Sequence, residues 1–290
     1  MCGPTTAIVY TDDELDAMRQ VRTMLKEKHD IAEDVVGLKY IALTTIISKN
    51  RPDEACEKIV KFVKALEAVE LGKNRKDDAP SPLTDDQLLL MASEEQLQEY
   101  LSVYHMCGVD LQRSEDDEKA GNNDGSGGRD SMWIRGDRVY RTPQEQQDAT
   151  RAGILFHFAT HCNPATLRRG LCHFVIDITN APTEKTGSEA KLQKINQSYP
   201  LRPQKIYIAG ASVAQRIIVN ALIKVASLFT KVKILQRIQF VTVEKAINDV
   251  ASATDGSHPV VYGGKGNGIP QDDLPQWVQR RIESFPVPEL

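Results

Sequence analysis

The sequence predicts an α/β fold in which a mostly parallel sheet is flanked by helices and preceded by an N-terminal helical segment. Two observations predict this class. After residue 128, apolar runs rich in β-branched residues alternate with helical patterns, which is typical of βαβ units. Residues 11–71 instead carry only the helical spacing of apolar positions. We therefore expect a helical segment over residues 1–80 and an α/β domain over residues 81–290.

The composition excludes several classes of protein. Apolar residues make up 41% of the 290 residues, which argues against a wholly disordered chain. The net charge of −4 excludes a uniformly basic nucleic-acid binder. No apolar run approaches the ~18 residues of a membrane span, and the N-terminal residues lack the features of a signal peptide. Five cysteines without a Cys-x-x-Cys pair favour a reducing compartment, so we expect a cytoplasmic protein.

Three helices are expected in the N-terminal segment. The first begins after Thr11, because a threonine followed by three acidic residues is a typical helix start. Residues 33–48 form a second apolar segment, which Arg51 and Pro52 separate from the third helix. Gly72 is expected to end that helix. The apolar positions at helical spacing are Leu15, Met18, Val21 and Leu25 in the first helix and Ile59, Phe62, Val63, Leu66 and Val69 in the third.

Two polar stretches interrupt the middle of the chain. Residues 72–87 combine two prolines with dense charge, which predicts a linker. A helix is expected over about 84–106. Residues 114–128 contain only one apolar residue other than glycine, Ala120, which predicts a flexible acidic loop.

Strands and helices alternate after that loop. The near-continuous apolar run at 171–179 is typical of a strand that is buried on both faces. Pro143 suits the first turn of a helix. The expected strands are 131–135, 171–179, 205–211 and 237–242, and the expected helices are 143–161, 187–198, 212–229 and 243–252.

The expected helix at 212–229 is apolar over a wide arc. Such a helix either is buried in a core or lines an apolar cavity. The cations Lys231, Lys233 and Arg237 follow it directly. Cations in this place suit contact with anionic lipid, and they equally suit a solvated helix C-terminus.

Motifs for covalent chemistry are weak. The glycine-rich segment 258–268 lacks the spacing of a phosphate-binding loop. His157 and His161 stand four residues apart beside Cys162, but no second ligand pair accompanies them, so we expect core packing and no metal. Asp177 stands near the end of an expected strand without an evident partner. We therefore expect neither an enzyme nor a bound cofactor, and an enzyme that uses Asp177 with a histidine is the remote alternative.

Five segments, in this order, resemble the CRAL-TRIO lipid-binding domains, in particular the phosphatidylinositol-transfer-like branch. The segment GRDSMWIR resembles the strand opening of the family, and LCHFVIDIT resembles its Val-x-Asp strand. SYPLRPQKIYIAGA is similar to its Tyr-Pro-Glu-Arg block, RIQFVT to its Lys-Ile-x-Phe strand, and HPVVYGGKG to its closing Gly-Gly segment. The ordered set covers about half of the chain.

The resemblance implies a hydrophobic cavity between the sheet and its helices, closed by one long helix at 212–229. Arg237 stands where the family has a lysine that contacts the lipid headgroup, and Arg202 keeps the arginine of the Tyr-Pro-Glu-Arg block. Both are candidate headgroup contacts, because arginine suits phosphate. Leu201 and Ile234 stand where the phosphatidylinositol-transfer branch has Glu and Thr. The candidate cavity walls are Val175, Ile206 and Ile208 on strands, and the candidate gate residues are Ile217, Ile218, Leu222 and Val225.

We therefore expect a lipid-binding or lipid-transfer protein that holds one phospholipid or other hydrophobic ligand in a gated apolar cavity. Its partners would be that ligand and, transiently, a membrane surface, with no nucleic acid. The alternative is an interaction module of the same fold without lipid, for example one that binds a small GTPase. The departures at Leu201 and Ile234 fit that alternative.

Overall fold

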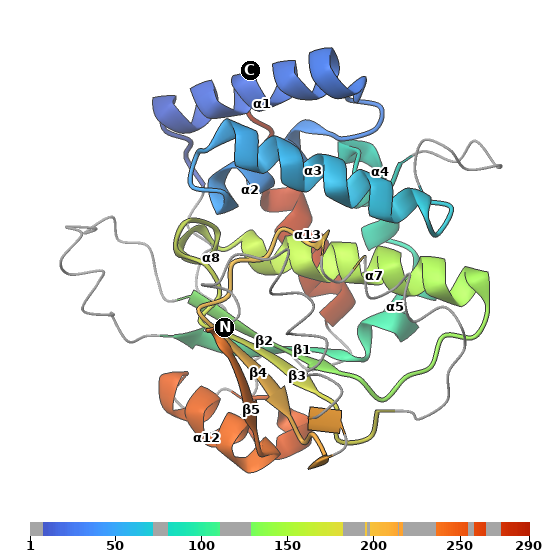
Figure 1. Cartoon of the computed structure of the whole chain (residues 1–290), viewed down its shortest axis with the longest axis vertical. Helices are drawn as coiled ribbons and strands as arrows, with labels where there is room; N and C mark the ends of the chain where they lie inside the picture. The colour runs from blue at the N-terminus through green and yellow to red at the C-terminus, as the bar shows by residue number, and fades with distance from the viewer. Residues whose placement is uncertain are drawn as a thin grey trace.

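The computed structural model contains one five-stranded sheet with helices on both of its faces, which confirms the α/β class, the mostly parallel sheet and the N-terminal helical segment (Figure 1). The strands are β1 Tyr104–Asp110, β2 Arg129–Arg135, β3 His173–Asp177, β4 Lys205–Ala209 and β5 Ile238–Val241, in that order across the sheet. The pair β1–β2 is antiparallel, and β2 to β5 are parallel. The structure describes residues 8–71, 81–110, 129–181, 195, 198–213, 215–216, 236–254, 258–264 and 274–290.

Most helices begin at side chains that cap their first backbone N–H groups. Thr11 and Thr142 form capping boxes with Glu14 and Glu145, and Asn163 accepts hydrogen bonds from two backbone N–H groups at the start of α8. The helices are α1 Asp12–His29, α2 Leu38–Ile47, α3 Pro52–Glu67, α4 Asp85–Ala92, α5 Glu95–Leu101, α7 Pro143–His161, α8 Pro164–Arg169, α12 Val243–Ala253 and α13 Leu274–Ser284, with the 3₁₀ turn η1 Val260–Tyr262. None of these helices is long and apolar enough to cross a membrane.

The expected single helix over 84–106 is wrong. The chain forms α4 and α5 there and then strand β1, whose Tyr104 pairs with Ile134 of β2. That pairing joins residues far apart in the sequence, so local periodicity gives no sign of it. The expected helix at 187–198 lies mostly outside the described residues, as do the helix at 212–229, the acidic loop 114–128 and most of the linker 72–87.

The sheet separates two apolar clusters. On one face, Trp133, Val175 and Tyr207 pack with Val250 of α12. On the other face, Met132 joins a large cluster that α7, α13 and the N-terminal helices share. Figure 1 shows the same layers, with α12 on one side of the sheet and α7, α13 and α1 to α3 stacked on the other. The N-terminal helices therefore contribute to the main core of the molecule.

Helix α13 is held by polar contacts from distant parts of the chain. Lys39 of α2 is buried, and its Nζ donates a hydrogen bond to the Ile282 carbonyl oxygen at 2.8 Å. The Tyr10 hydroxyl donates to the Pro286 carbonyl oxygen at 2.7 Å. Both acceptors lie near the end of α13, where carbonyl groups lack partners within the helix.

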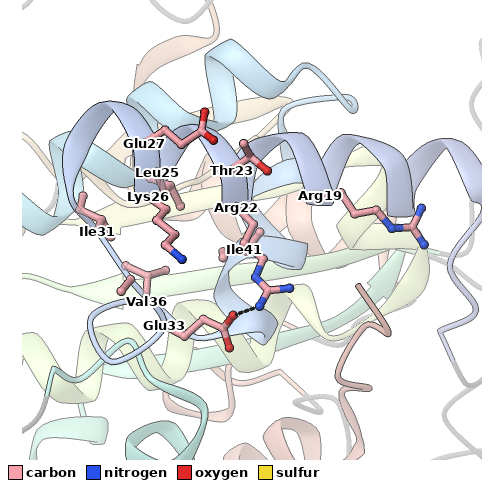
Figure 2. A pocket seen from close by; sticks show the side chains of 11 residues that line it. Arg19, Arg22, Thr23, Leu25, Lys26, Glu27, Ile31, Glu33, Val36 and Ile41 are labelled. Atoms are coloured by element: carbon pink, nitrogen blue, oxygen red, sulfur yellow. Dashed lines mark ion pairs between the residues drawn. The ribbon is translucent and has the colours of Figure 1, made fainter.

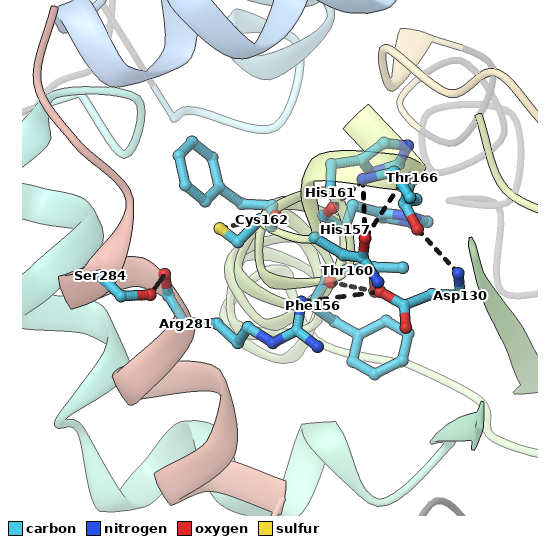
Figure 3. A network of polar contacts seen from close by, with 12 residues as sticks. Asp130, Phe156, His157, Thr160, His161, Cys162, Thr166, Arg281 and Ser284 are labelled. Atoms are coloured by element: carbon cyan, nitrogen blue, oxygen red, sulfur yellow. Dashed lines mark hydrogen bonds and ion pairs between the residues drawn. The ribbon is translucent and has the colours of Figure 1, made fainter. Parts of the chain in front are cut away.

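An ion pair connects α13 to the sheet (Figure 3). Arg281 Nη1 lies 3.7 Å from Asp130 Oδ2, and the Asp130 side chain is fully buried. The Asp130 backbone N–H donates to Thr166 Oγ1 of α8 at 2.7 Å. Burial raises the pKa of the Asp130 carboxyl, and the Arg281 guanidinium opposes that rise. Asp130 therefore joins β2, α8 and α13 at one buried point.

Arg281→Met is expected to lower the free energy of unfolding by about 3 kcal/mol, because it leaves the Asp130 carboxylate buried without its cation. Denaturant unfolding measures the change. The control Arg280→Met removes an exposed arginine from the same helix and should change stability by less than about 0.5 kcal/mol. Adding Asp130→Asn to Arg281→Met should restore part of the loss; equal losses in the single and double variants would contradict the ion pair's role.

Candidate functional site

Strands β3, β4 and β5 present six apolar side chains on the sheet face opposite α12, which we call the apolar face. Alternation along each strand and the parallel register place them in two rows. The first row is Phe174, Ile206 and Ile238, and the second is Ile176, Ile208 and Phe240.

The apolar face is only partly packed by the residues that the structure describes. Phe174 contacts the main cluster, whereas the other five side chains belong to neither cluster of described residues. Ile208 is buried, and the remaining members are half-buried. Neighbouring apolar side chains that stay accessible on a sheet face are a feature of ligand sites and interfaces.

The structure brings Ile206 and Ile208 together on the apolar face but separates Val175 from them. Val175 is opposite Tyr207 in the register, and both point to the α12 side of the sheet. Val175 is fully buried there beside Trp133. Sequence patterns could not assign these faces, because all three residues are apolar on strands that are covered on both sides. Ile217, Ile218, Leu222 and Val225 lie outside the described residues.

Arg202 and Arg237 lie at the amino ends of neighbouring strands. Arg202 precedes β4, and its Nη1 donates to the Arg168 carbonyl oxygen at 2.8 Å. Arg237 precedes β5, and its Nη1 donates to the Pro203 carbonyl oxygen at 2.8 Å. Neither guanidinium forms a salt bridge with a carboxylate among the described residues. Both arginines are half-buried at one edge of the sheet, next to the first row of the apolar face.

Two further arginines add positive charge at this edge. Burial lowers the pKa of the Arg202 guanidinium, and the cations Arg237, Arg51 and Arg129 lower it further. Glu54 is the acidic group that opposes them. Arg51 precedes α3, and the buried Arg129 opens β2. Sequence reasoning missed Arg51 and Arg129, because they stand far from Arg202 along the chain.

A glycine fixes the path of the chain beside Arg202. Gly170 ends α8 with a positive φ of 88°, a region that favours glycine. A Cβ atom at this position would lie 2.1 Å from the Arg202 carbonyl oxygen. Only glycine therefore allows the end of α8 to approach the Arg202 backbone this closely. This close contact fixes the position of the Arg202 backbone beside the sheet edge.

His157 of α7 packs near Phe174, at one end of the apolar face. Its ring lies 4.1 Å from the Tyr199 ring and 6.3 Å from the Phe174 ring, measured between centroids. The ring is buried, and Nδ1 has no hydrogen-bond partner among the described residues. Burial lowers the pKa of His157 to about 3, helped by His161, whose own pKa burial lowers to about 4. Both imidazoles are therefore neutral parts of the core at pH 7.

The remaining candidates for chemistry have structural partners. Asp177 Oδ1 accepts hydrogen bonds from Thr179 N at 2.9 Å and Thr179 Oγ1 at 2.7 Å. Its Oδ2 accepts from the Tyr262 hydroxyl, which joins the 258–264 segment to β3. Within the described ranges, no group of three or more potential ligands could hold a metal ion.

Comparison with known families finds no family that matches this chain. No curated protein matches it either. The resemblance to the CRAL-TRIO domains therefore remains a prediction from the five sequence segments.

His157→Phe is expected to make the protein less sensitive to acid. The folded state keeps this imidazole neutral down to a pKa of about 3, whereas an unfolded histidine binds a proton near its ordinary value of 6.5. Below about pH 6.5 the unfolded state thus binds more protons, so the free energy of unfolding falls as the pH falls. Removing His157 should reduce that slope by about 1.4 kcal/mol per pH unit between about pH 6 and about pH 4.

Urea unfolding at several pH values measures the slope for each variant. Phenylalanine preserves the ring contacts with Tyr199 and Phe174, so packing changes little. His29→Phe is the matched control, because His29 is exposed at the end of α1. This variant should show the same dependence of the free energy of unfolding on pH as the parent protein. A His157→Phe slope identical to that of the parent would show that this imidazole does not remain neutral in the fold.

Proposed function

We propose that the protein binds one amphiphilic lipid with an anionic headgroup. The hydrocarbon part lies along the apolar face, and the headgroup lies at the sheet edge beside Arg202 and Arg237. The observation that carries this proposal is the adjacency of the two features, because Arg237 directly precedes β5 and Arg202 lies three residues before β4, and both strands belong to the apolar face. An amphiphile is the ligand class whose two ends match such a surface.

The physical chemistry of the two parts supports this ligand class. Complete burial of hydrocarbon contributes roughly 0.8 kcal/mol per CH₂ group, so contact between an acyl chain and the apolar face favours binding. Arginine binds phosphate oxygens through two parallel hydrogen bonds, and a partly desolvated site strengthens them. Arg51 and Arg129 add to the positive potential that an anionic headgroup meets. The binding itself needs no covalent chemistry.

The helix expected at 212–229 is the proposed cover of this site. Its apolar residues Ile217, Ile218, Leu222 and Val225 would face the hydrocarbon when the site is closed. The same residues would face a membrane when the site is open, and the following cations would meet anionic lipid. A transient peripheral association with the membrane follows from this proposal.

Native mass spectrometry of the protein purified from a eukaryotic lysate, followed by lipid extraction, tests the proposal. We expect one co-purified lipid per chain, with an anionic headgroup. A protein that carries no lipid and takes up none from mixed liposomes would overturn the proposal. That outcome would favour the interaction module, whose partner would then occupy the apolar face.

Arg202→Gln and Arg237→Gln are each expected to weaken transfer of phosphatidic acid between vesicles by about tenfold, because each removes one cation from the headgroup site. Transfer of phosphatidylcholine should change less than twofold in the same assay. Arg280→Gln, on the exposed side of α13, is the matched control and should leave both rates unchanged. Equal loss for the two lipids would refute a headgroup role for these arginines.

A further inference from the structure

A hollow lies on the N-terminal helices, away from the apolar face. It has a volume of about 470 Å³ and lies between the second half of α1 and the segment that leads into α2 (Figure 2). Its base is apolar and closely packed, since Leu25, Val36 and Ile41 are each 2% exposed or less. Figure 1 places α1 at the end of the molecule opposite α12. A molecule bound here would therefore leave the sheet edge free.

Three cations stand along the rim of the hollow. Arg19, Arg22 and Lys26 follow one another at spacings of three and four residues, which places them on the same side of α1. Arg22 forms an ion pair with Glu33 across the hollow, and Arg19 forms one with Asp16. Figure 2 shows Lys26 extending from α1 toward Val36, beside the Arg22–Glu33 pair.

Lys26 is a cation without a counter-charge in the described part of the chain. It forms no hydrogen bond or ion pair there, although it lines the hollow. The side chains of Arg22 and Glu33 are 44% and 48% exposed, and an ion pair so exposed contributes only ~0–1 kcal/mol. A ligand carboxylate can therefore replace Glu33 at Arg22 at little cost and also reach Lys26.

The charge and size of the hollow limit its occupant. Arg19 pairs with Asp16 and Arg22 with Glu33, and Glu27 stands on the same rim, so Lys26 is the one cation of the three that forms no ion pair within the described ranges. This balance favours a ligand group with one negative charge over a phosphate with two. The volume falls within the range of sites for small molecules, roughly 300–1,000 Å³, and holds a few side chains. Ile31, which is 8% exposed, offers a small apolar contact beside the cations.

We propose that this hollow docks an acidic peptide segment of a partner protein. One carboxylate binds Lys26 and Arg22, and a neighbouring aliphatic side chain packs beside Ile31. Recognition of acidic motifs by clustered cations is an established mode of peptide binding. The site does not depend on the lipid proposed above, and partner and lipid can be bound together.

Titration of the ¹⁵N-labelled full chain with the blocked peptide Leu-Glu-Glu-Leu, followed by NMR, tests the proposal. We expect shift changes at the residues that line the hollow, with a dissociation constant of about 1 mM. Leu-Gln-Gln-Leu, which keeps the size but lacks the charge, should bind about tenfold more weakly. Arg202→Gln should leave the peptide titration unchanged. The outcome of the titration therefore does not depend on whether the lipid proposal is correct.

Charge variants on α1 locate the contact. Lys26→Glu should weaken peptide binding at least about tenfold, whereas Lys28→Glu, the same charge change on the same helix outside the hollow, should change it less than twofold. The double variant Arg22→Glu/Lys26→Glu should bind Leu-Lys-Lys-Leu instead. The spectra also report whether each variant is folded.

Three results would overturn the proposal. The first is the absence of shift changes around the hollow at peptide concentrations of about 10 mM. The second is an equal loss of binding in Lys26→Glu and Lys28→Glu, which would indicate attraction by net charge alone. The third is inorganic phosphate producing the same shifts at the same affinity, which would mark a bare anion site.

Discussion

The pleat of the three parallel strands β3, β4 and β5 is the constraint on which the rest of the structure depends. Alternation sends Val175 and Tyr207 to the α12 side, where they are buried, and Ile206 and Ile208 to the other side. Both faces carry apolar residues, although the α12 side also holds polar ones such as Lys205 and Gln239, and the two faces have different neighbours. One face completes a core with α12, and the other remains partly accessible beside the arginines of the sheet edge. A shift of one residue in the register would exchange these two roles.

Local signals in the sequence predicted most elements correctly. Helix α1 begins after Thr11 and α7 begins at Pro143, as expected, and the apolar runs at 171–179, 205–211 and 237–242 contain β3, β4 and β5. These elements carry their own signals in caps, proline positions and β-branched residues. Strand β1 carries no such signal, since its pairing with β2 decides its conformation.

The candidate site could be predicted only in part, for the same physical reason. Arg202 and Arg237 became candidates because they match basic positions in the motifs of the resembled family. Arg51 and Arg129 come from other segments, and only the fold brings them to the same edge. The separation of Val175 from Ile206 likewise needs the register of the strands, which composition does not contain.

The contacts that hold α13 also have a consequence for the order in which the chain folds during synthesis. Each strand pairs with the one made before it, so the sheet can grow as the polypeptide leaves the ribosome. The N-terminal helices lack this advantage, because Lys39 finds its acceptor 243 residues later in the chain. Until α13 is made, that ammonium group and the apolar surface around it stay in contact with water or with other proteins. The first helices to be synthesised are therefore among the last parts of the molecule to complete their contacts. A chaperone would matter most during the period before α13 is made.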